Sequence, residues 1–427
     1  MNYKLVNKKN FIFRASISMF VKSFSVLAMF LMTLIISRSL DIYEAGLFFL
    51  GFTVITLLSS FGRIGLEQTL VKKIAIFKNI NSFPKLQSLY RRSMLLCATF
   101  CVFISLLLIF LWDPFISNIF GKKEFKSVFF IMMLCLPFFS LNSLNAFAFQ
   151  GLEKITTSLI LLSILIPIQV STYVYVFEIS SATQTAWAFL CASLIAFIIG
   201  AVIWLHSVPK GNGNEIVSNK SILRTSIPLW IFVVVSQLIQ FYSQLILGIY
   251  GSISDVAILA VSQRISLLVS LMLLAINYVV SPILARLYDE GNIEEIRKLC
   301  VYTVRILLAV GLPVISAIII FPSEILSLFG KEYTSGAIVL IILVFGQLIN
   351  IMTGSVGFLL SMTKYENVLR NQTMLTALVV LPLGVYLISS FGLFGAAITT
   401  SISIALHNLL LALSVYSKLG INVLKFW

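Results

Sequence analysis

Charged residues are scarce in this sequence, and acidic residues are the scarcer kind. Lys, Arg, Asp and Glu make up 11% of its 427 residues, with 30 basic residues against 16 acidic ones. Soluble globular chains carry about 25% charged residues, so this composition excludes an ordinary soluble domain. With 59% hydrophobic residues and a mean hydropathy of +1.04, the chain is expected to be a polytopic membrane protein.

Residues that bind metals are also few. The two histidines, His206 and His407, are far apart in the sequence. The five cysteines lie in or beside apolar runs and lack the paired loop spacing of a metal site or a disulfide framework; they are Cys97, Cys101, Cys135, Cys191 and Cys300. Such cysteines are expected to be small buried hydrophobes. We therefore expect no metal site and no cofactor.

Motifs for ATP hydrolysis and features of nucleic-acid binding are lacking too. There is no GxxxxGK[ST] loop and no soluble domain, so ATP hydrolysis is not expected. The net charge of +14 comes mostly from short segments between apolar runs, where basic residues fix the orientation of membrane proteins. We therefore expect no nucleic-acid partner. The basic start leads into a full-length apolar run without a small-residue cleavage site, so this run is expected to remain as a helix.

Long apolar runs, in contrast, are abundant. Runs of about 20 residues predict an all-α protein with about twelve transmembrane helices. Their limits are 15–36, 44–64, 93–112, 127–149, 156–177, 184–206, 225–247, 256–281, 301–321, 335–360, 371–390 and 394–417. With the amino terminus inside, the cytoplasmic segments hold 21 Lys and Arg against 5 on the opposite side. This ratio predicts that both termini are cytoplasmic.

Two segments in the chain are similar to each other. Residues 112–125 read WDPFISNIFGKKEF and residues 321–333 read FPSEILSLFGKEY, each between two apolar runs at the corresponding place in its half. This repeat predicts two pseudo-symmetric six-helix bundles, 1–207 and 222–427, joined by a cytoplasmic linker at 208–221. Transporters built from such parallel repeats bind their substrate between the repeats.

Lys22 lies inside the first apolar run. An ammonium group at the centre of a membrane-spanning helix costs about 2.5–3.5 kcal/mol, so it indicates a functional site. Ser18 and Ser25 share its helix face at spacings of four and three residues. This polar stripe is expected to line a cavity or a helix contact. The alternatives are pairing of Lys22 with a carboxylate or carbonyl groups, or a reach to the headgroups.

Four other spans carry polar stripes at helical spacing. Amides facing lipid would lack hydrogen-bond partners, so these faces are expected to point inward, as the lining of an aqueous lumen or as helix contacts. The candidate residues are Thr56, Ser60 and Arg63 in the second span, Asn142 and Asn145 in the fourth, Gln237, Gln240 and Gln244 in the seventh, and Gln347 and Asn350 in the tenth.

Arg264, in the eighth span, is the second deep charge; Arg63 could instead anchor headgroups. A cavity with Lys22 and Arg264 would attract anions. A guanidinium group can grip phosphate with two parallel hydrogen bonds, and amide and hydroxyl groups suit sugar hydroxyls. The residues therefore predict an anionic cargo that carries sugars.

Three stretches carry a family resemblance. They are ISRSLDIYEAGLFFLGFTVITLLSSFGRIGLEQTLVKKIA (36–75), VAILAVSQRISLLVSLMLLAINYVVSPILARLYDEGN (256–292) and FGLFGAAITTSISIALHN (391–408). The GRIGL ending of the second span and the GLFGAA entry to the last one are the clearest motifs. The chain resembles polysaccharide flippases of the O-antigen (Wzx-like) type, in the multidrug/oligosaccharidyl-lipid/polysaccharide exporter superfamily.

The resemblance implies a cargo and a location. The cargo would be an oligosaccharide repeat unit of O-antigen, lipopolysaccharide or another surface polysaccharide, linked to undecaprenyl diphosphate. The chain would move it to the outer leaflet of the bacterial inner membrane by alternating access. Membrane lipids, a polysaccharide polymerase and chain-length proteins would be its partners. Related flippases carry cations on the first and eighth helices, where Lys22 and Arg264 fall. Lys22 departs from the arginine typical of peptidoglycan-precursor members, and the chain lacks their two extra helices.

Two other functions are open at this point. One is a multidrug or metabolite antiporter of the same superfamily, which the positive sign of the inferred cavity disfavours for cationic cargo. The other is a membrane-embedded polymerase or ligase acting on the same lipid. Those enzymes generally need a sizeable extracytoplasmic loop, and the longest outer connection here runs from about 113 to 126. We therefore expect that the protein is not an enzyme.

Overall fold

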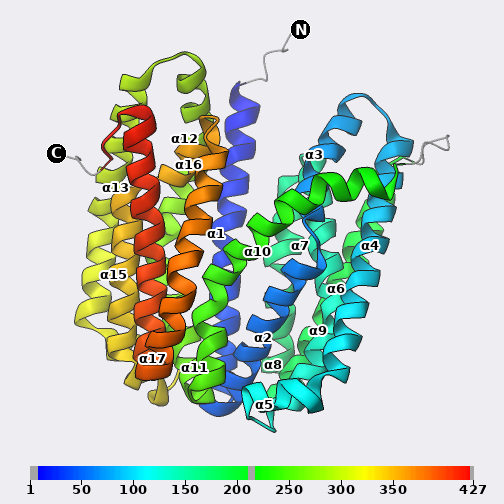
Figure 1. Ribbon diagram of the computed structural model, residues 1–427, viewed down its shortest axis with the longest axis vertical. Coiled ribbons are helices and arrows are strands. Elements are labelled where there is room, and N and C mark those ends of the chain that lie inside the picture. The colour runs from blue at the N-terminus through cyan, green and yellow to red at the C-terminus, as the bar shows by residue number, and fades with distance from the viewer. Residues whose placement is uncertain (1–7, 210–216, 424–427) are drawn as a thin grey trace. The chain divides into compact units, whose positions relative to one another are not determined.

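The chain folds as a series of helices (Figure 1). The structure, a computed structural model, describes residues 8–209 and 217–423, without the side chains of 8–20, 278, 279 and 282. No β-strand occurs in these residues, and eleven of their helical segments are long and apolar enough to cross a membrane. The predicted class, an all-α polytopic membrane protein, is confirmed.

The contacts of the chain divide it into two compact units, 24–241 (unit A) and 1–23 with 242–427 (unit B). The divisions fall inside α1 (Lys8–Ser39) and α10 (Asn219–Tyr250), which are unbroken helices. They do not fall at the expected linker, 208–221, of which 210–216 lie outside the described residues. The two bundles therefore share long helices, and apolar pattern alone gives no signal for a boundary inside such a helix.

Unit A is built around α6 (Phe125–Gly151). The other elements of unit A are α2 (Ile42–Gly62), α3 (Leu66–Asn79), α4 (Phe83–Phe110), η1 (Trp112–Ile116), α5 (Ser117–Phe120), α7 (Ile155–Ser163), α8 (Leu165–Val176) and α9 (Ala182–Ser207). Of these, α6 packs against α2, α3, α4, α7 and α9. Aromatic rings fill the space between α2, α6 and α9, where the Phe189 ring meets those of Phe48, Phe52 and Phe139.

Unit B is built around α15 (Ala337–Thr353), the tenth predicted span, as unit A is built around the fourth. Its other elements are α11 (Ile253–Leu267), η2 (Leu268–Ser270), α12 (Leu271–Asp289), α13 (Ile293–Ile320), α14 (Pro322–Ser327), η3 (Lys331–Gly336), α16 (Val356–Met362) and α17 (Glu366–Leu419). The two similar segments of the sequence form short helices, α5 and α14, and each is followed by a glycine with positive φ, Gly121 or Gly330.

Three spans are broken where the sequence predicted one helix. Ile164 separates α7 from α8, the 3₁₀ turn η2 separates α11 from α12, and Gly354 with Ser355 separates α15 from α16. The spans predicted at 371–390 and 394–417 both lie in α17, whose backbone leaves the helical conformation at Gly392 (φ 54°, ψ −126°). Counting α17 as two spans, the described residues hold twelve candidate spans, the number that was predicted.

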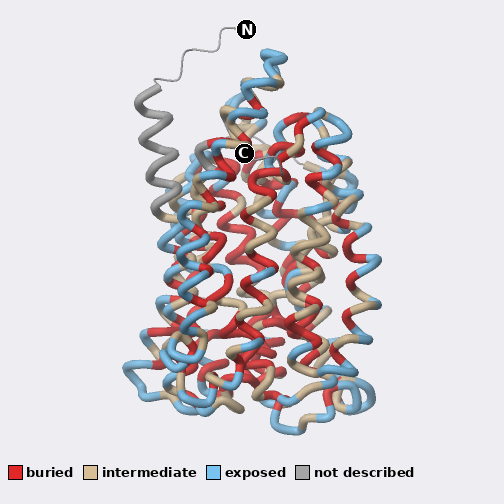
Figure 2. Tube along the Cα trace, turned by 90° about the vertical axis from the view of Figure 1, so that its left-hand side faces the viewer, coloured by how far each residue is buried: buried red, intermediate tan, exposed pale blue. Residues whose placement is uncertain are grey.

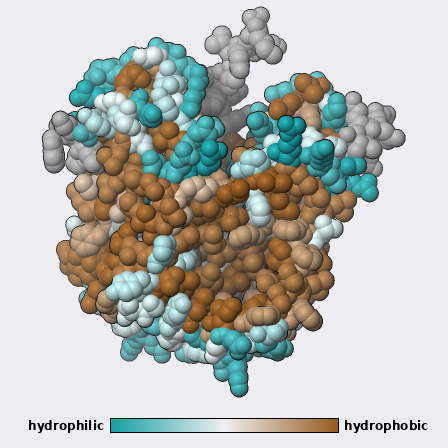
Figure 3. Space-filling model, viewed as in Figure 1, coloured by the Kyte–Doolittle hydropathy of each residue, from teal (hydrophilic) through white to brown (hydrophobic). Residues whose placement is uncertain are grey.

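The surface agrees with a membrane environment. Along many of the described helices, buried residues alternate with exposed ones, so one face of the helix packs inward (Figure 2), whereas α2 has no exposed residue. The face drawn in Figure 3 is hydrophobic on both units between hydrophilic ends. Lipid tails can cover such a surface, which explains why a chain this hydrophobic still exposes many large apolar side chains.

Candidate functional site

Arg264 lies on α11 in unit B. Its side chain is partly buried and makes no hydrogen bond or ion pair with any residue that the structure describes. The adjacent Gln263 donates a hydrogen bond from Nε2 to Thr400 Oγ1 on α17, at 3.4 Å. Because a buried cation without a counter-charge is costly, a guanidinium group in this setting favours an anion.

Three polar side chains meet where two spans are broken. Ser270 Oγ, in η2, donates a hydrogen bond to Gln347 Oε1. Asn350 Nδ2 donates to the same Gln347 oxygen at 3.1 Å and to Ser270 Oγ at 3.2 Å. We call Ser270, Gln347 and Asn350 the amide cluster. Broken helices in transporters commonly hold the binding groups, because freed backbone and polar side chains can only be tolerated away from lipid.

The amide cluster is close to Arg264 along the chain. Ser270 follows Arg264 by six residues, or about 9 Å along a helix axis. Unit B therefore combines one guanidinium group with amide and hydroxyl groups on the same span and its neighbour α15. The sequence predicted Gln347 and Asn350 on one polar stripe and Arg264 as a separate candidate, and the structure joins the two amides to Ser270.

Lys22 lies on α1 and also belongs to unit B. Its side chain is partly buried, and it interacts with at least one other group. Ser25, one turn further on, is buried and belongs to unit A. The side chain of Ser18 lies outside the described residues.

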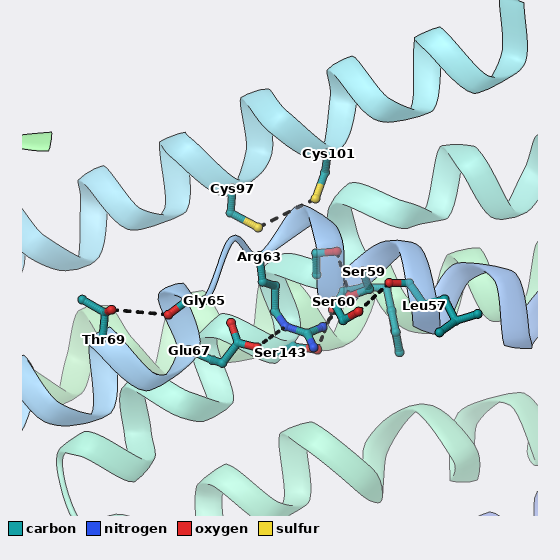
Figure 4. A network of polar contacts seen from close by, with 12 residues as sticks. Leu57, Ser59, Ser60, Arg63, Gly65, Glu67, Thr69, Cys97, Cys101 and Ser143 are labelled. Carbon is teal, nitrogen blue, oxygen red and sulfur yellow. Dashed lines mark hydrogen bonds and ion pairs between the residues drawn. The ribbon is translucent and has the colours of Figure 1, made fainter. Parts of the chain in front are cut away.

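In unit A, Arg63 is neutralised by an acid. Its Nε lies 3.4 Å from Glu67 Oε1, and its Nη1 donates to Ser59 Oγ at 2.5 Å (Figure 4). Ser140 on α6 donates to the same Ser59 oxygen at 2.9 Å. Arg63 and Glu67 are both buried, and the other carboxylate oxygen, Glu67 Oε2, has no hydrogen-bond partner among the described residues. The acid in contact neutralises Arg63 within the protein, so this contact supports neither the headgroup anchor nor the cavity cation that the sequence suggested.

The chain turns sharply between these two residues. The stripe predicted at Thr56, Ser60 and Arg63 continues at helical spacing to Glu67, as if on one helix, but α2 ends at Gly62 and α3 begins at Leu66. Ile64 and Gly65 both have positive φ, and a Cβ at Gly65 would lie 2.4 Å from the Ser226 carbonyl oxygen of α10. Glycine is therefore required at position 65 both by backbone conformation and by space.

The two asparagines of α6 connect helices. Asn145 Oδ1 accepts a hydrogen bond from the Tyr90 hydroxyl at 2.6 Å, and its Nδ2 donates to the Phe197 carbonyl oxygen at 3.2 Å. Asn142 Nδ2 donates to the Leu161 carbonyl oxygen at 2.8 Å. Both side chains are at most 1% exposed. These contacts join α6 to α4, α7 and α9.

The remaining candidates have mixed surroundings. Thr56 and Ser60 donate to the carbonyl oxygens of Phe52 and Leu57 in their own helix. On α10, Gln240 is exposed and Gln237 is partly buried, while Gln244 is buried and lies in unit B. No group of three His, Cys, Asp or Glu that could hold a metal ion occurs among the described residues.

Sequence profiles of two families match the chain. The polysaccharide biosynthesis protein profile matches residues 13–288, which is more than half of the sequence. The chain belongs to the polysaccharide biosynthesis protein family. A second profile, that of the MatE family, matches residues 228–386. The resemblance found in the sequence is thus confirmed at the level of the family.

Two archaeal proteins are similar to this family member. Agl15, the probable low-salt glycan biosynthesis flippase of Haloferax volcanii, is 26% identical over 174 residues. That match covers 40% of this chain and 37% of Agl15, little more than a third of its length. An uncharacterized membrane protein of Methanocaldococcus jannaschii is 23% identical over 403 residues, which cover 87% of this chain and 77% of that protein.

Solved structures with the same fold are transporters. An inward-facing MATE family multidrug transporter superposes with a TM-score of 0.77 at 15% identity, covering 95% of this chain and 98% of the other. The lipid II flippase MurJ superposes with a TM-score of 0.71 at 17% identity, covering 94% and 87%. This polysaccharide biosynthesis family member therefore has the fold of the exporter superfamily that its sequence resembled.

Sequence reasoning missed four serine and glutamate residues of these networks. Ser270, Ser59, Ser140 and Glu67 were not among the candidates, although Glu67 continues the stripe of the second span at helical spacing. Serine is common in membrane helices, so Ser59 and Ser270 gave no signal of their own. Glu67 follows the GRIGL motif, and an acidic residue four positions after an arginine is a signal that could have identified the pair.

Proposed function

We propose that the protein is a flippase that moves a lipid-diphosphate-linked oligosaccharide across the membrane. The match of residues 13–288 to the polysaccharide biosynthesis family carries this proposal. The description of Agl15 as a glycan biosynthesis flippase and the likeness of the fold to MurJ support it. In its specific form, the cargo is an O-antigen or other surface-polysaccharide unit on undecaprenyl diphosphate, carried from the cytoplasmic to the outer leaflet by alternating access.

The chemistry of unit B suits this cargo. Arg264 offers a guanidinium group that no described residue neutralises, and a diphosphate presents oxygens in the geometry that such a group binds with two hydrogen bonds. The amide cluster offers the donors and acceptors that sugar hydroxyls need. We assign phosphate binding to Arg264, with Lys22 as a second cation, and sugar contacts to Gln347 and Asn350. A polymerase and chain-length proteins would act on the cargo after its release.

Removal of the guanidinium group tests the assignment. We expect Arg264→Ala to abolish transfer of a lipid-diphosphate oligosaccharide between leaflets of proteoliposomes, with normal amounts of folded protein. Arg264→Lys should keep part of the rate, because an ammonium group retains the charge but not the paired hydrogen bonds. Arg286→Ala is the matched control, since Arg286 is exposed and lies 3.7 Å from Glu290. Transfer at the wild-type rate by Arg264→Ala would refute the role of Arg264.

A drug or metabolite exporter is the second candidate, because the MatE profile matches 228–386. A cationic drug would need an acidic group within the spans. In α11, α12, α13 and α17 of unit B, every Asp and Glu lies in the first or last turn, and α15 and α16 have none. This distribution favours the anionic cargo. A deletion strain that becomes sensitive to cationic drugs but keeps its surface polysaccharide would favour the exporter.

A further inference from the structure

One end of unit A carries basic residues without acidic partners. α3 and the first turns of α4 and α10 lie together there, since Lys73 Nζ donates to Ser221 Oγ at 3.2 Å and Arg92 Nη1 donates to Asn219 Oδ1 at 3.2 Å. Lys72, Arg91 and Arg224, one on each of these helices, are exposed and make no hydrogen bond or ion pair with a described residue. We call these three the basic rim.

The described acidic residues near the rim are already engaged. Glu153 pairs with Lys78 at 2.8 Å, and the buried Glu67 pairs with Arg63. Lys154, also at this end, donates to a neutral oxygen, Ser207 Oγ, at 2.9 Å. Partial burial lowers the pKa of Lys73, which also donates to the Ser221 carbonyl oxygen at 3.0 Å. The described part of this end therefore has a clear excess of positive charge.

Each rim cation is followed by an exposed aliphatic side chain about one helical turn further on. Ile76 follows Lys72, Leu95 follows Arg91, and Ile227 follows Arg224, with exposures of 49%, 56% and 47%. α3 lies between the spans Ile42–Gly62 and Phe83–Phe110, so its exposed face is at a membrane surface. A cation beside an exposed aliphatic group matches the boundary between phosphate headgroups and acyl chains.

Unit B gives an internal comparison. At the corresponding turn between α12 and α13, Arg286, Arg297 and Lys298 each lie within 4 Å of a glutamate three or four residues away on the same chain. Basic residues that only fix orientation can thus be neutralised by neighbouring acids. The three rim cations, on three different helices, are not neutralised in this way.

We propose that the basic rim of unit A binds the anionic headgroups of membrane phospholipids. Charge favours any anionic partner, including an acidic protein, but the exposed isoleucine and leucine next to each cation favour lipid. This proposal does not depend on the identity of the cargo, because it concerns lipids at the surface of unit A.

Lipid retention tests the proposal without a transport assay. The full-length protein is equilibrated in mixed micelles containing equal amounts of phosphatidylglycerol and phosphatidylcholine, and the retained lipids are counted by mass spectrometry. We expect wild-type protein to retain more phosphatidylglycerol than phosphatidylcholine. In the triple variant K72Q/R91Q/R224Q, the ratio of the two retained lipids should fall about fivefold for each cation removed. Raising the salt concentration should weaken the wild-type preference, since exposed charges are screened.

Two further variants make the result specific. The charge-retaining variant K72R/R91K/R224K should keep the preference, and R286Q/R297Q/K298Q in unit B should leave it unchanged. Inorganic phosphate should fail to displace the retained phosphatidylglycerol, which separates a headgroup held with its acyl chains from phosphate alone. An absent preference in wild-type protein, an unchanged one in K72Q/R91Q/R224Q, or an equal loss in the unit B variant would overturn the proposal.

Discussion

At the scale of single residues, the buried Arg63 and the partly buried Arg264 have opposite surroundings. Arg63 has an acid and a hydroxyl in contact, whereas Arg264 has no described partner. A charge that another residue neutralises is satisfied within the protein and needs no ligand. A charge that is left open can be neutralised by a ligand. The difference is the reason that Arg264, and not Arg63, is assigned to the cargo.

The buried pair in unit A gives a prediction for stability. Glu67→Ala leaves the guanidinium group of Arg63, which is 7% exposed, without a counter-charge, and this should cost about 3–5 kcal/mol. Thermal unfolding of the purified protein in detergent measures the loss as a lower Tm. The double variant Arg63→Met with Glu67→Leu should recover most of it, since no buried charge remains.

A matched control uses an exposed pair of the same kind. Glu153 is 67% exposed on its side chain and lies 2.8 Å from Lys78, so Glu153→Ala should cost about 0–1 kcal/mol. If Glu153→Ala lowers the Tm as much as Glu67→Ala does, the cost of removing the acid from an ion pair does not depend on burial of the pair.

The hydroxyl of Tyr90 gives a second prediction. Tyr90→Phe removes the donor to Asn145 Oδ1 and leaves that buried oxygen unpaired, which should destabilise the protein by about 1–3 kcal/mol. The Tyr90 ring should keep its stacking on Trp204, whose centroid is 4.1 Å away. Tyr386→Phe, at an exposed tyrosine, serves as the control, and equal Tm values for the two variants would argue against the Asn145 contact.

At the scale of helices, the spans could be predicted because about 20 apolar residues have no other stable state in a bilayer. Their ends and breaks could not. α3 is amphipathic and lies between two predicted spans, and α4 begins at Phe83, ten residues before the predicted span. Polar residues at a membrane surface lower the mean hydropathy, so hydropathy does not reveal these helical residues. The break at Gly354 depends on one backbone conformation within an apolar run, which composition does not reveal.

Of the candidate site in unit B, the individual residues could be predicted from the sequence, but their contacts could not. Arg264 stood out because a charge in an apolar run is rare, and Gln347 and Asn350 because amides are costly in lipid. Their common contact with Ser270 depends on how η2 packs against α15, which is a property of the fold and not of either segment.

The break in α17 at Gly392 gives a prediction at the scale of one helix. A Cβ at Gly395 would lie 2.0 Å from the Leu387 carbonyl oxygen, a backbone atom that cannot move aside. Gly395→Ala should therefore prevent close approach of the two halves of α17 and sharply reduce the yield of folded protein. Gly357→Ala is the control, because its Cβ would meet only Leu411 Cδ1 at an ordinary 3.6 Å. Comparable yields of monodisperse protein from both variants, measured by size-exclusion chromatography, would contradict this account.

At the scale of the whole molecule, the excess of basic over acidic residues has a direction. The 21 Lys and Arg assigned to one side and 5 to the other predict that the rim of unit A faces the cytoplasm, together with both termini, of which 1–7 and 424–427 lie outside the described residues. The same direction is needed by the proposed function, because a lipid-linked precursor made in the cytoplasm must reach the binding groups from that side.

Labelling of single cysteines checks this orientation. In a background in which the exposed Cys191 is replaced by Ala, Lys72→Cys is placed on the rim and Lys123→Cys between α5 and α6, both at exposed positions. A membrane-impermeant maleimide should label Lys123→Cys in intact cells and Lys72→Cys only after the cells are permeabilised. The four buried cysteines should stay unlabelled in both states. Labelling of Lys72→Cys from outside intact cells would invert the predicted topology, and with it the direction of transport that we propose.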